Sequence, residues 1–518
     1  MSGPGPCRLV RAEKPDDPGV CGDQRMMEAK EACGVFGVYA PGRSVAHLVF
    51  DGLYALQHRG QESAGMAVSD GDAITVMKDM GLVTTVFDER KLSGLRGHLA
   101  IGHTRYSTAG SSDWIHAQPV FRGVGRAGFA LGHNGNLTNT AELGESAGML
   151  PGLVSSDSDL VAELLGQAFP PDLPERTRAQ HVDDLERALL SVLPAVEGAF
   201  SFVLLDADRL IGVRDPNGFR PLCLGRLEAT DEFEMGWVLA SESPALDVIG
   251  ATFIRELEPG EMVVIDGKEV RSERPFPVER LDPKLCIFEF VYFARPDTTL
   301  YGNEVHGARR RMGQLLATQA PVAGDLVMGV PDSGVPAAEG YAVASGIPYG
   351  QGLVKNRYIG RTFIAPTQAE RANGVRRKLN PLRENIAGKR VIVVDDSIVR
   401  GTTTRAMVVM LREAGATEVH LRISSPPFKW PCYYGIDTPD RTELLASIKT
   451  LEEIVEFLNV DSLEYLTLEH LVRAIDAPGA GFCDACLTGN YPVPVPVPVV
   501  VDIAARPALS GAARGAQG

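Results

Sequence analysis

The chain has 518 residues, which is enough for about two or three domains with hydrophobic cores of their own. A hydrophobic content of 44% and a charged content of 23% are ordinary for a soluble globular protein, and a net charge of −15 excludes a general attraction to nucleic acid or to anionic membranes. There is no secretory signal and no membrane-spanning apolar run, and eight cysteines are too few for a disulfide scaffold. We therefore expect a cytoplasmic protein whose clustered cysteines serve catalysis or metal binding.

Residues 1–32 are rich in Pro, Gly and charge and have little apolar periodicity, so we expect a disordered or removable segment. Residues 33–270 alternate strand and helix signals and are the first expected domain. Within it we expect helices at 160–168 and 181–193, strands at 201–206 and 262–266, and Gly-rich turns at 102–110, 123–135 and 212–219. Residues 271–284, rich in Pro and charge, are the expected linker.

Residues 285–492 are the second expected domain, because strand candidates there are separated by helices. The candidates are 325–330, 391–394 and 418–423. Such β-α repetition indicates an α/β domain with a parallel sheet. Residues 440–476 are predicted to form a helix, a turn and a second helix, and the Pro-rich tail 493–518 is expected to be extended and mobile.

The most informative stretch is 391–405, V-I-V-V-D-D-S-I-V-R-G-T-T-T-R. The predicted strand ends at Asp395 and Asp396, and Thr402 and Thr403 are expected to cap the helix that follows the loop. The first N–H groups of this helix and the two carboxylates suit a phosphorylated ligand, with sugar hydroxyls or Mg²⁺ near the carboxylates. Two adjacent Asp residues alone would fit any strand–helix turn. The full stretch, however, resembles the loop by which type I phosphoribosyltransferases bind phosphoribosyl pyrophosphate (PRPP).

This resemblance implies a PRPP site made of several segments. Ser333, in the segment G-V-P-D-S-G, would lie on the pyrophosphate side and bind Mg²⁺ together with Asp395 and Asp396. Residues 355–361 resemble the flexible loop that closes over PRPP and excludes water. The implied PRPP-binding residues are Lys355, Arg357, Tyr358, Arg361, Asp395, Asp396, Ser397, Ile398, Val399, Arg400, Gly401, Thr402 and Thr403. The basic run 376–378 fits a solvated face and a pyrophosphate contact equally well.

A second candidate site begins at Cys33, which directly precedes strand-like sequence in A-C-G-V-F-G. A lone cysteine is often only a small buried hydrophobe. Here four polar, Gly-rich segments follow it, at 57–65, 102–110, 133–137 and 156–159. In this order they resemble the class II glutamine amidotransferases. That resemblance implies an N-terminal-nucleophile fold, in which two antiparallel sheets are sandwiched between helices.

Hydrolysis of the glutamine amide needs a nucleophile, a base and oxyanion donors. If residues 1–32 are removed, the new α-amine of Cys33, with a pKa of about 8, can activate its own thiol. The resemblance supplies the Asn134 side chain and the Gly135 N–H as oxyanion donors. The implied glutamine-binding residues are Arg105 for the α-carboxylate, Asp157 for the α-ammonium, and Arg59 and Thr108. We expect His58, His103 and His133 to be structural.

Four further cysteines, Cys286, Cys432, Cys483 and Cys486, can make a Cys₄ site. From spacing alone, zinc, an iron–sulfur cluster and unligated core cysteines all remain open. The contexts S-P-P-F-K-W-P-C-Y-Y-G-I-D and C-D-A-C-L-T-G-N-Y-P resemble a propeptide-bearing family branch that binds a [4Fe–4S] cluster. The expected role of that cluster is to hold the C-terminal segment on the second domain. The remaining cysteines, Cys7, Cys21 and Cys223, are interpreted as incidental.

The two halves together resemble the glutamine PRPP amidotransferases over residues 33–492. This implies that glutamine, PRPP and water give 5-phosphoribosylamine, glutamate and pyrophosphate, in the committed step of purine synthesis. It also implies a homotetramer inhibited by AMP, ADP, GMP or GDP. One alternative is another class II amidotransferase, which the D-D-S-I-V-R-G-T-T loop disfavours. The other is a PRPP-sensing regulator, which the complete glutaminase motif set and the lack of a basic DNA-binding module disfavour.

Overall fold

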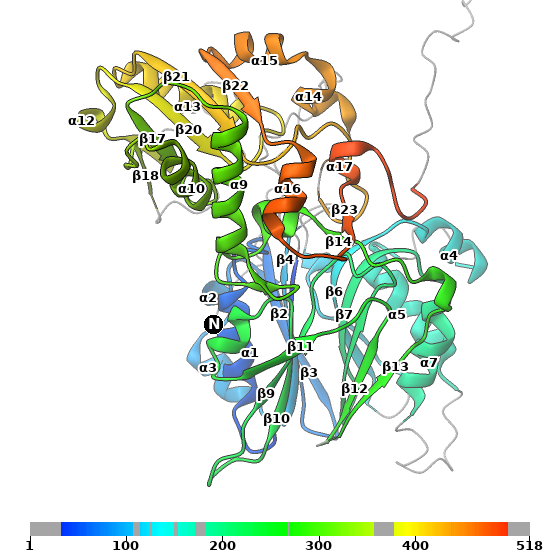
Figure 1. Cartoon of the computed structure of the whole chain (residues 1–518). Helices are drawn as coiled ribbons and strands as arrows, with labels where there is room; N and C mark the ends of the chain where they lie inside the picture. The colour runs from blue at the N-terminus through cyan, green and yellow to red at the C-terminus, as the bar shows by residue number, and fades with distance from the viewer. Residues whose placement is uncertain are drawn as a thin grey trace, which may run out of the picture.

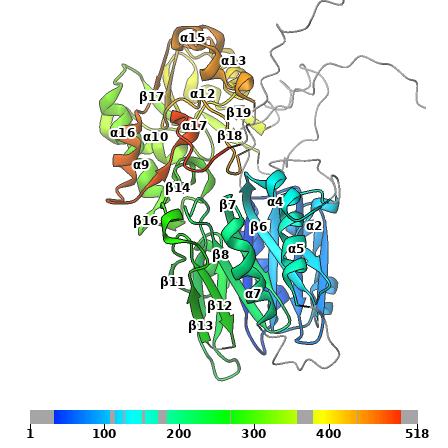
Figure 2. The ribbon, with the colours of Figure 1, turned by 90° about the vertical axis from the view of Figure 1, so that its right-hand side faces the viewer.

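Two layered domains make up the fold in the computed structural model, which describes residues 33–106, 114–124, 127–149, 154–170, 183–267, 269–356, 378–436, 438 and 440–495. The first domain is a sandwich of two antiparallel sheets, and the second is built on a parallel sheet. Figures 1 and 2 show the second domain seated over one end of the sandwich. Within the described ranges, no helix combines the length and apolar character needed to cross a membrane.

The sandwich has the predicted architecture of two antiparallel sheets between helices. One sheet has the order β11 (Thr252–Glu256), β9 (Cys223–Leu227), β10 (Gly236–Ala240), β1 (Gly34–Tyr39), β4 (Leu99–Arg105), β2 (Ser63–Ser69), β3 (Ile74–Met80). The other has the order β13 (Glu269–Glu273), β12 (Met262–Asp266), β8 (Arg209–Arg214), β7 (Gly198–Leu205), β6 (Phe129–Leu137), β5 (Val120–Arg122). The central position of β1 fixes the segment that carries Cys33 between two hydrogen-bonded neighbours, β10 and β4.

Each sheet of the sandwich is buried on both faces. Side chains alternate along β1, so that Val35 joins the core between the sheets while Phe36 packs into the outer helix layer. The first sheet is covered by α1 (Val45–Ala55), α2 (Val83–Val86), α3 (Glu89–Gly94) and α8 (Pro244–Asp247). The second is covered by α4 (Thr140–Ser146), α5 (Asp157–Ala168) and α7 (Asp184–Val192), so the expected helices at 160–168 and 181–193 are present within the described residues.

The expectation of Gly-rich turns is wrong for four glycines that lie inside strands. Gly102 is in β4, Gly132 and Gly135 are in β6, and Gly212 is in β8. A Cβ on Gly102 would stand 2.5 Å from Val49 of α1, and one on Gly212 would stand 2.7 Å from Leu239 of the opposite sheet. Gly102 and Gly212 therefore mark close approach between layers rather than chain reversal.

The second domain has four parallel strands in the order β17 (Leu326–Gly329), β20 (Arg390–Asp395), β21 (Glu418–Ile423), β22 (Ser462–Tyr465). Its predicted strands are therefore confirmed. One face packs on α9 (Val305–Gln319), α10 (Val335–Ser345) and α16 (Leu468–Ile475). The other packs on α13 (Thr402–Glu413) and α15 (Leu451–Leu458). In β20, Ile392 and Val394 face the first layer and Val391 and Val393 the second, which explains the continuous β-branched run.

Short elements complete the second domain. They are β14 (Leu285–Cys286), β15 (Thr299–Leu300), β16 (Asn303–Glu304), β18 (Leu353–Lys355), β19 (Leu379–Pro381), β23 (Phe482–Cys483), α12 (Arg383–Ile386), α14 (Leu445–Ile448) and α17 (Ala485–Thr488). A π-helical turn spans Glu289–Phe293 and a 3₁₀ turn spans Arg441–Glu443 in this domain. Further 3₁₀ turns span Trp114–His116 and Leu193–Ala195 in the first domain, and Val278–Arg280 between the domains.

Three boundary predictions need correction. The helix–turn–helix expected at 440–476 is interrupted by β22, where Leu463 and Tyr465 point into the core and Glu464 outward. The expected linker 271–284 begins inside a strand, because β13 continues the second sheet to Glu273. At the C-terminus, Val493 is held by hydrogen bonds in both directions with the Tyr434 hydroxyl, so the extended tail begins later than residue 493. The remainder of the tail lies outside the described residues.

A fully buried network of charges joins the two domains. Arg59, between α1 and β2, pairs with Glu242 of its own domain and with Glu289 of the second domain. Arg220, which follows β8, also pairs with Glu289 at 3.3 Å. All four side chains are 0% exposed. Two guanidinium groups thus balance two carboxylates without help from solvent, and separating the domains would leave buried charges unpaired.

The network predicts a large stability effect at Arg59. Replacing Arg59 with Ala leaves Glu242 and Glu289 with less compensation, and we expect a loss of about 3–5 kcal/mol in the free energy of unfolding. The matched control is Arg226→Ala, since Arg226 pairs with Glu228 at 2.7 Å on an exposed surface, where a loss of less than about 1 kcal/mol is expected. Thermal unfolding measures both. Equal midpoints for the two variants would contradict this account of the interface.

Candidate active sites

Cys33 lies immediately before β1, with its side chain buried. Its Sγ accepts a hydrogen bond from the Tyr106 N–H at 3.4 Å and can donate to the Tyr106 carbonyl at the same distance. Burial raises the pKa of the thiol above its usual value, and the backbone hydrogen bond from Tyr106 only partly offsets this. The thiol is therefore protonated at neutral pH and needs a base before it can act as a nucleophile.

Arg105 and Asp157 lie close enough to Cys33 to change the pKa of its thiol electrostatically, although burial and the backbone hydrogen bond have larger effects. Arg105, at the end of β4, is 3.7 Å from Glu62, and its Nη1 makes no hydrogen bond among the described residues. Burial would raise the pKa of the Asp157 carboxyl, but His133 and two backbone N–H groups outweigh it and lower the pKa. A cation and an ionised carboxylate thus stand beside the thiol, as an amino-acid substrate requires.

Asn134, on β6, is buried, and neither its Nδ2 nor its Oδ1 has a hydrogen-bond partner among the described residues. A buried polar group without a partner costs about 1–3 kcal/mol, so such a group is expected only where a ligand can use it. The next residue, Gly135, has φ +147°, and a Cβ there would stand 2.0 Å from the Ala199 carbonyl oxygen. Only glycine fits this backbone, which supports the sequence-based interpretation of the Asn134–Gly135 pair as an oxyanion site.

One predicted glutamine contact is wrong. Arg59 is fully buried and its guanidinium is occupied by Glu242 and Glu289, so it cannot reach a substrate carboxylate. The motif Q-H-R-G-Q-E is instead an interface element. Thr108, the other predicted contact, lies outside the described residues.

The three histidines occupy structural positions. The His103 ring bonds the His133 carbonyl at 2.9 Å, and burial lowers its pKa to about 3, which keeps the ring neutral. His133 lies 3.6 Å from Asp157, and His58 pairs with Glu242 at 2.7 Å. Each histidine therefore orients a neighbouring group.

The predicted phosphate loop lies at the carboxyl end of the parallel sheet, between β20 and α13. The Asp396 carboxylate accepts a hydrogen bond from Ser397 at 2.6 Å, and the Asp396 N–H donates to Asp395 at 3.0 Å. The helix cap is not Thr402 or Thr403, as predicted, but Gly401 in the left-handed conformation with φ +73°. Because Gly401 has no side chain, no side-chain cap occupies the first-turn N–H groups, which suits a phosphate.

Three of the predicted PRPP contacts are constrained by packing. Ile398 and Val399 are buried in the two cores on opposite faces of the sheet, so only their backbone can contact a ligand. The Arg400 guanidinium pairs with Glu443 of the following 3₁₀ turn. The resemblance named these residues without distinguishing side chains that are buried or paired from backbone groups that a ligand could reach.

The predicted pyrophosphate-side loop adjoins the phosphate loop, because β17 and β20 are parallel neighbours. A Cβ on Gly334 would stand 2.5 Å from the Val394 carbonyl oxygen, so this turn packs directly on β20 and brings Ser333 to the same edge as Asp395. Lys355, at the end of β18, pairs with Asp332 at 2.8 Å. The predicted closing-loop residues Arg357, Tyr358 and Arg361 lie outside the described residues, as do Arg376 and Arg377.

The four cysteines outside the glutaminase site converge from three segments. Cys286 on β14 and Cys483 on β23 are register partners, Cys486 lies in α17, and Cys432 precedes the Tyr433–Gly435 turn. All four are free thiols. Cys432 acts electrostatically on the other three, Cys286 acts on Cys483 and Cys486, and Cys483 acts on Cys486. Burial raises the pKa of Cys286 to about 12, and burial likewise raises the pKa values of Cys483 and Cys486. Such thiols lose their protons only to a bound metal. Cys223 instead lies on β9 in the sandwich core.

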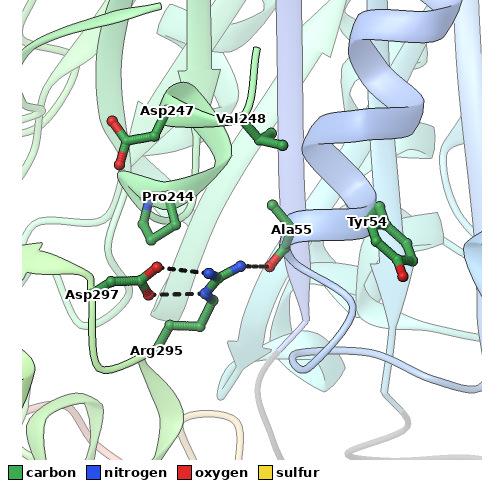
Figure 3. A pocket seen from close by; sticks show the side chains of 7 residues that line it. All are labelled: Tyr54, Ala55, Pro244, Asp247, Val248, Arg295 and Asp297. Atoms are coloured by element: carbon green, nitrogen blue, oxygen red, sulfur yellow. Dashed lines mark hydrogen bonds and ion pairs between the residues drawn. The ribbon is translucent and has the colours of Figure 1, made fainter. Parts of the chain in front are cut away.

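A separate cavity of about 410 Å³ lies where α1, α8 and the start of the second domain meet (Figure 3). Arg295 crosses it, bonding Asp297 at 2.9 and 2.6 Å and the Ala55 carbonyl at 3.2 Å. The lining residues are Tyr54, Ala55, Pro244, Asp247, Val248, Arg295 and Asp297. None of them belongs to the predicted sites.

The sequence indicated no role for Asn136, Arg220 or Glu289, which make contacts between the two domains. Arg220 lies in the segment R-D-P-N-G-F-R-P-L (214–222), directly after the predicted Gly-rich turn 212–219. The available signal was the charge of this segment. It contains two arginines and an aspartate, which is unusual for a segment that is buried. Glu289 carried a weaker signal as the only acid within the apolar run I-F-E-F-V-Y-F.

Comparisons with known proteins agree with these two sites. A glutamine amidotransferase domain family matches residues 103–248, and a phosphoribosyl transferase domain family matches residues 301–424. The chain is 50% identical to the amidophosphoribosyltransferase of Mycobacterium leprae, covering 94% of this chain and 85% of the relative. It is 44% identical to that of Bacillus subtilis, covering 91% and 96%.

Two solved structures are similar as well. The glutamine PRPP amidotransferase of B. subtilis complexed with ADP and GMP has a TM-score of 0.79 at 44% identity and covers 89% of this chain and 98% of its own. A structure described as the allosteric regulatory enzyme of purine biosynthesis has a TM-score of 0.80 at 42% identity, covering 92% and 100%. With a glutaminase constellation, a phosphate loop and relatives that match along both domains, the chain belongs to the amidophosphoribosyltransferase family.

Proposed function

We propose that the chain hydrolyses glutamine at Cys33 and transfers the ammonia to C1 of PRPP, giving 5-phosphoribosylamine, glutamate and pyrophosphate. This is the first committed step of purine synthesis. The observation that carries the residue-level proposal is the buried Asn134 amide, which lacks a partner among the described residues in the domain that places Arg105 and Asp157 beside Cys33.

In the glutaminase half, the substrate α-carboxylate pairs with Arg105 and its α-ammonium with Asp157. The α-amine of a processed Cys33 accepts the thiol proton while Sγ attacks the amide carbon. Asn134 Nδ2 and the Gly135 N–H donate to the oxyanion. The protonated amine then passes its proton to the departing nitrogen, so ammonia leaves and a thioester remains. Water hydrolyses the thioester to glutamate.

Replacing Cys33 with Ala separates the two half-reactions. Glutamine-dependent synthesis is expected to fall to background because the nucleophile is gone. Ammonia-dependent synthesis is expected to stay within about twofold of the unmodified enzyme, because the PRPP loop is untouched. Phosphoribosylamine formation with each nitrogen source measures this. Cys223→Ala, which removes another buried thiol of the same domain, is the matched control, and loss of both activities in Cys33→Ala would assign Cys33 a structural role.

In the transferase half, the first-turn N–H groups of α13 and the loop backbone hold the 5′-phosphate, and Lys355 helps to neutralise the pyrophosphate. Asp395 and Asp396, with Ser333, would hold Mg²⁺, which supplies positive charge beside the phosphates. Ammonia attacks C1 of the ribose as the bond from C1 to pyrophosphate breaks. Hydrogen bonds within the loop orient both carboxylates: the Ser397 hydroxyl donates to Asp396, and the Asp396 N–H donates to Asp395.

A double substitution of Asp395 and Asp396 by Asn tests the transferase site. It preserves the side-chain shape but removes both charges, so synthesis from glutamine and from ammonia is expected to fall together by at least about 100-fold, or roughly 3 kcal/mol of barrier. Rates at saturating glutamine and at saturating ammonia measure this. The control Asp325→Asn removes an exposed carboxylate paired with Arg390 on the same sheet. An unchanged ammonia-dependent rate in the double variant would refute the assignment.

We further propose that Cys286, Cys432, Cys483 and Cys486 hold a [4Fe–4S] cluster that fastens the C-terminal segment to the second domain. Four free thiols, three of which lie close enough to Cys486 to act on it electrostatically, support a shared metal group. A cube spreads its thiolates more widely than a zinc ion with bonds of about 2.3 Å. Within the described ranges no three His, Cys, Asp or Glu side chains are grouped to hold a single metal ion, so the proposal of a cluster rests on the sequence contexts of the four cysteines and on their convergence from three segments.

The remaining proposals concern maturation, assembly and regulation. Residues 1–32 are removed so that the α-amine of Cys33 becomes free, and the mature cytoplasmic enzyme is a homotetramer. The B. subtilis relative was solved with ADP and GMP. AMP, ADP, GMP or GDP can place a 5′-phosphate in the loop between β20 and α13, and would thereby compete with PRPP.

Native mass spectrometry of anaerobically purified enzyme tests processing, cluster and assembly in one measurement. The expected species is a tetramer of chains that begin at Cys33, each carrying four iron and four sulfide ions. Denaturing mass spectrometry of the same sample gives the chain start. A chain that keeps Met1 or Ser2 while active would exclude the α-amine as base, and a colourless, iron-free sample would exclude the cluster.

A further inference from the structure

The turn Cys432–Gly435 contacts both domains. It carries one of the four cysteines of the second domain, and the Tyr434 N–H donates to the Cys432 Sγ at 3.4 Å. Its next carbonyl groups are bound by side chains of the sandwich domain. Asn136 Nδ2 donates to the Tyr433 carbonyl at 2.9 Å. Arg220 donates to the Tyr434 carbonyl from Nη2 at 2.7 Å and from Nε at 3.2 Å.

Packing fixes the turn as firmly as these hydrogen bonds. The ring of Phe219 stacks on Tyr434 with 4.5 Å between centroids. Gly435 has φ +116°, and a Cβ there would stand 2.7 Å from the Arg220 Nη2. The Phe219 carbonyl accepts the N–H of Cys286, a second member of the cysteine site, at 3.1 Å. The sandwich domain therefore contacts the backbone at or beside two of the four cysteines, Cys286 and Cys432.

Asn136 carries this contact into the glutaminase site. It lies on β6, two residues after Asn134 and directly after Gly135. Its amide also bonds the Leu137 carbonyl at 3.2 Å, and the Leu137 N–H donates to Asp157 at 3.2 Å. The end of β6 thus has a cysteine-site contact on one side and groups of the glutamine site on the other. Displacement of the Tyr433 carbonyl would remove a contact that holds the end of β6 next to the proposed oxyanion donors, while the pairing of β6 with β7 remains.

We propose that Asn136 is a positioning residue for glutamine hydrolysis, through which the Cys432–Gly435 turn holds the oxyanion donors in place. This rests on the proposed role of Asn134 and Gly135. The cysteine site then has a function beyond holding the C-terminal segment: when its four thiols are gathered by a metal group, the turn is fixed and the glutaminase geometry is complete. When they are released, glutamine hydrolysis is lost before ammonia-dependent synthesis.

The test compares Asn136→Ala with Asn139→Ala in anaerobically purified enzyme. Asn139 Nδ2 also donates to a backbone carbonyl, that of Ala195 at 2.9 Å, but within its own domain. For Asn136→Ala we expect kcat with glutamine to fall about tenfold, the rate equivalent of one lost hydrogen bond. The KM for glutamine, the ammonia-dependent rate and the iron content per chain should stay unchanged. Asn136→Gln, which keeps the donor, should recover part of the lost kcat, and Asn139→Ala should change none of these quantities.

Several outcomes would overturn the proposal. An unchanged kcat in Asn136→Ala would show that the contact positions nothing, and a parallel loss of ammonia-dependent activity or of iron would show general damage instead. Asn134→Ala is measured alongside: if it leaves kcat intact, the proposed oxyanion site itself fails, whatever Asn136 does.

Removal of iron tests the link to the cysteine site. In the unmodified enzyme, chelation should lower the ratio of glutamine- to ammonia-dependent rates about tenfold, and in Asn136→Ala it should leave the ratio unchanged. A constant ratio in the unmodified enzyme would refute the link. If purified enzyme never contains iron, the cluster proposal fails, but the comparison of Asn136 with Asn139 still decides whether the turn positions β6.

Discussion

The arrangement of the two domains depends on one buried carboxylate. Glu289 has no exposed surface and is paired with Arg59 and Arg220, which come from separate segments of the sandwich. A buried ion network of this kind adds little net stability compared with apolar packing, but breaking it is costly. It therefore acts through geometry: only one orientation of the domains satisfies all of its charges. That orientation places the Cys33 end of the sandwich against the segment that opens the second domain.

Because the network fixes the domains, several weaker contacts can cross the same interface in a defined way. Arg220 bonds the turn that carries Cys432 as well as Glu289, so the charge network and the cysteine site share one side chain. The carboxylate of Glu242 accepts hydrogen bonds from Thr298 and from the Arg295 N–H in the second domain. The buried charge network thus shares its side chains with the other contacts between the two domains.

Local patterns in the sequence predicted most of the fold. The alternation along β1 and the β-branched run of β20 reflect burial that depends on near neighbours, so both strands could be identified. The sequence did not reveal the function of Arg59, because its partners lie 183 and 230 residues away and no local pattern indicates them. Glycine was ambiguous for the same reason. Gly102 permits contact with a helix and Gly401 a helix cap, and only tertiary contacts distinguish these uses.

The candidate sites show the same difference between features that the sequence indicates and features that depend on tertiary contacts. The Asn134–Gly135 pair came from the family resemblance, and the structure adds that the Asn134 amide has no partner among the described residues and that only glycine fits the backbone at 135. The phosphate loop was predictable as a segment, but its side chains are used differently from expectation. Ile398 and Val399 anchor the loop in cores on opposite faces of the sheet, and Gly401 leaves the helix start without a side-chain cap. The loop is held in shape by its apolar residues and offers its ligand mainly backbone N–H groups. A phosphate bound at this helix start would therefore be recognised by the backbone, and the two proposed Mg²⁺-binding carboxylates at the strand end would be the groups that distinguish PRPP from other phosphate esters.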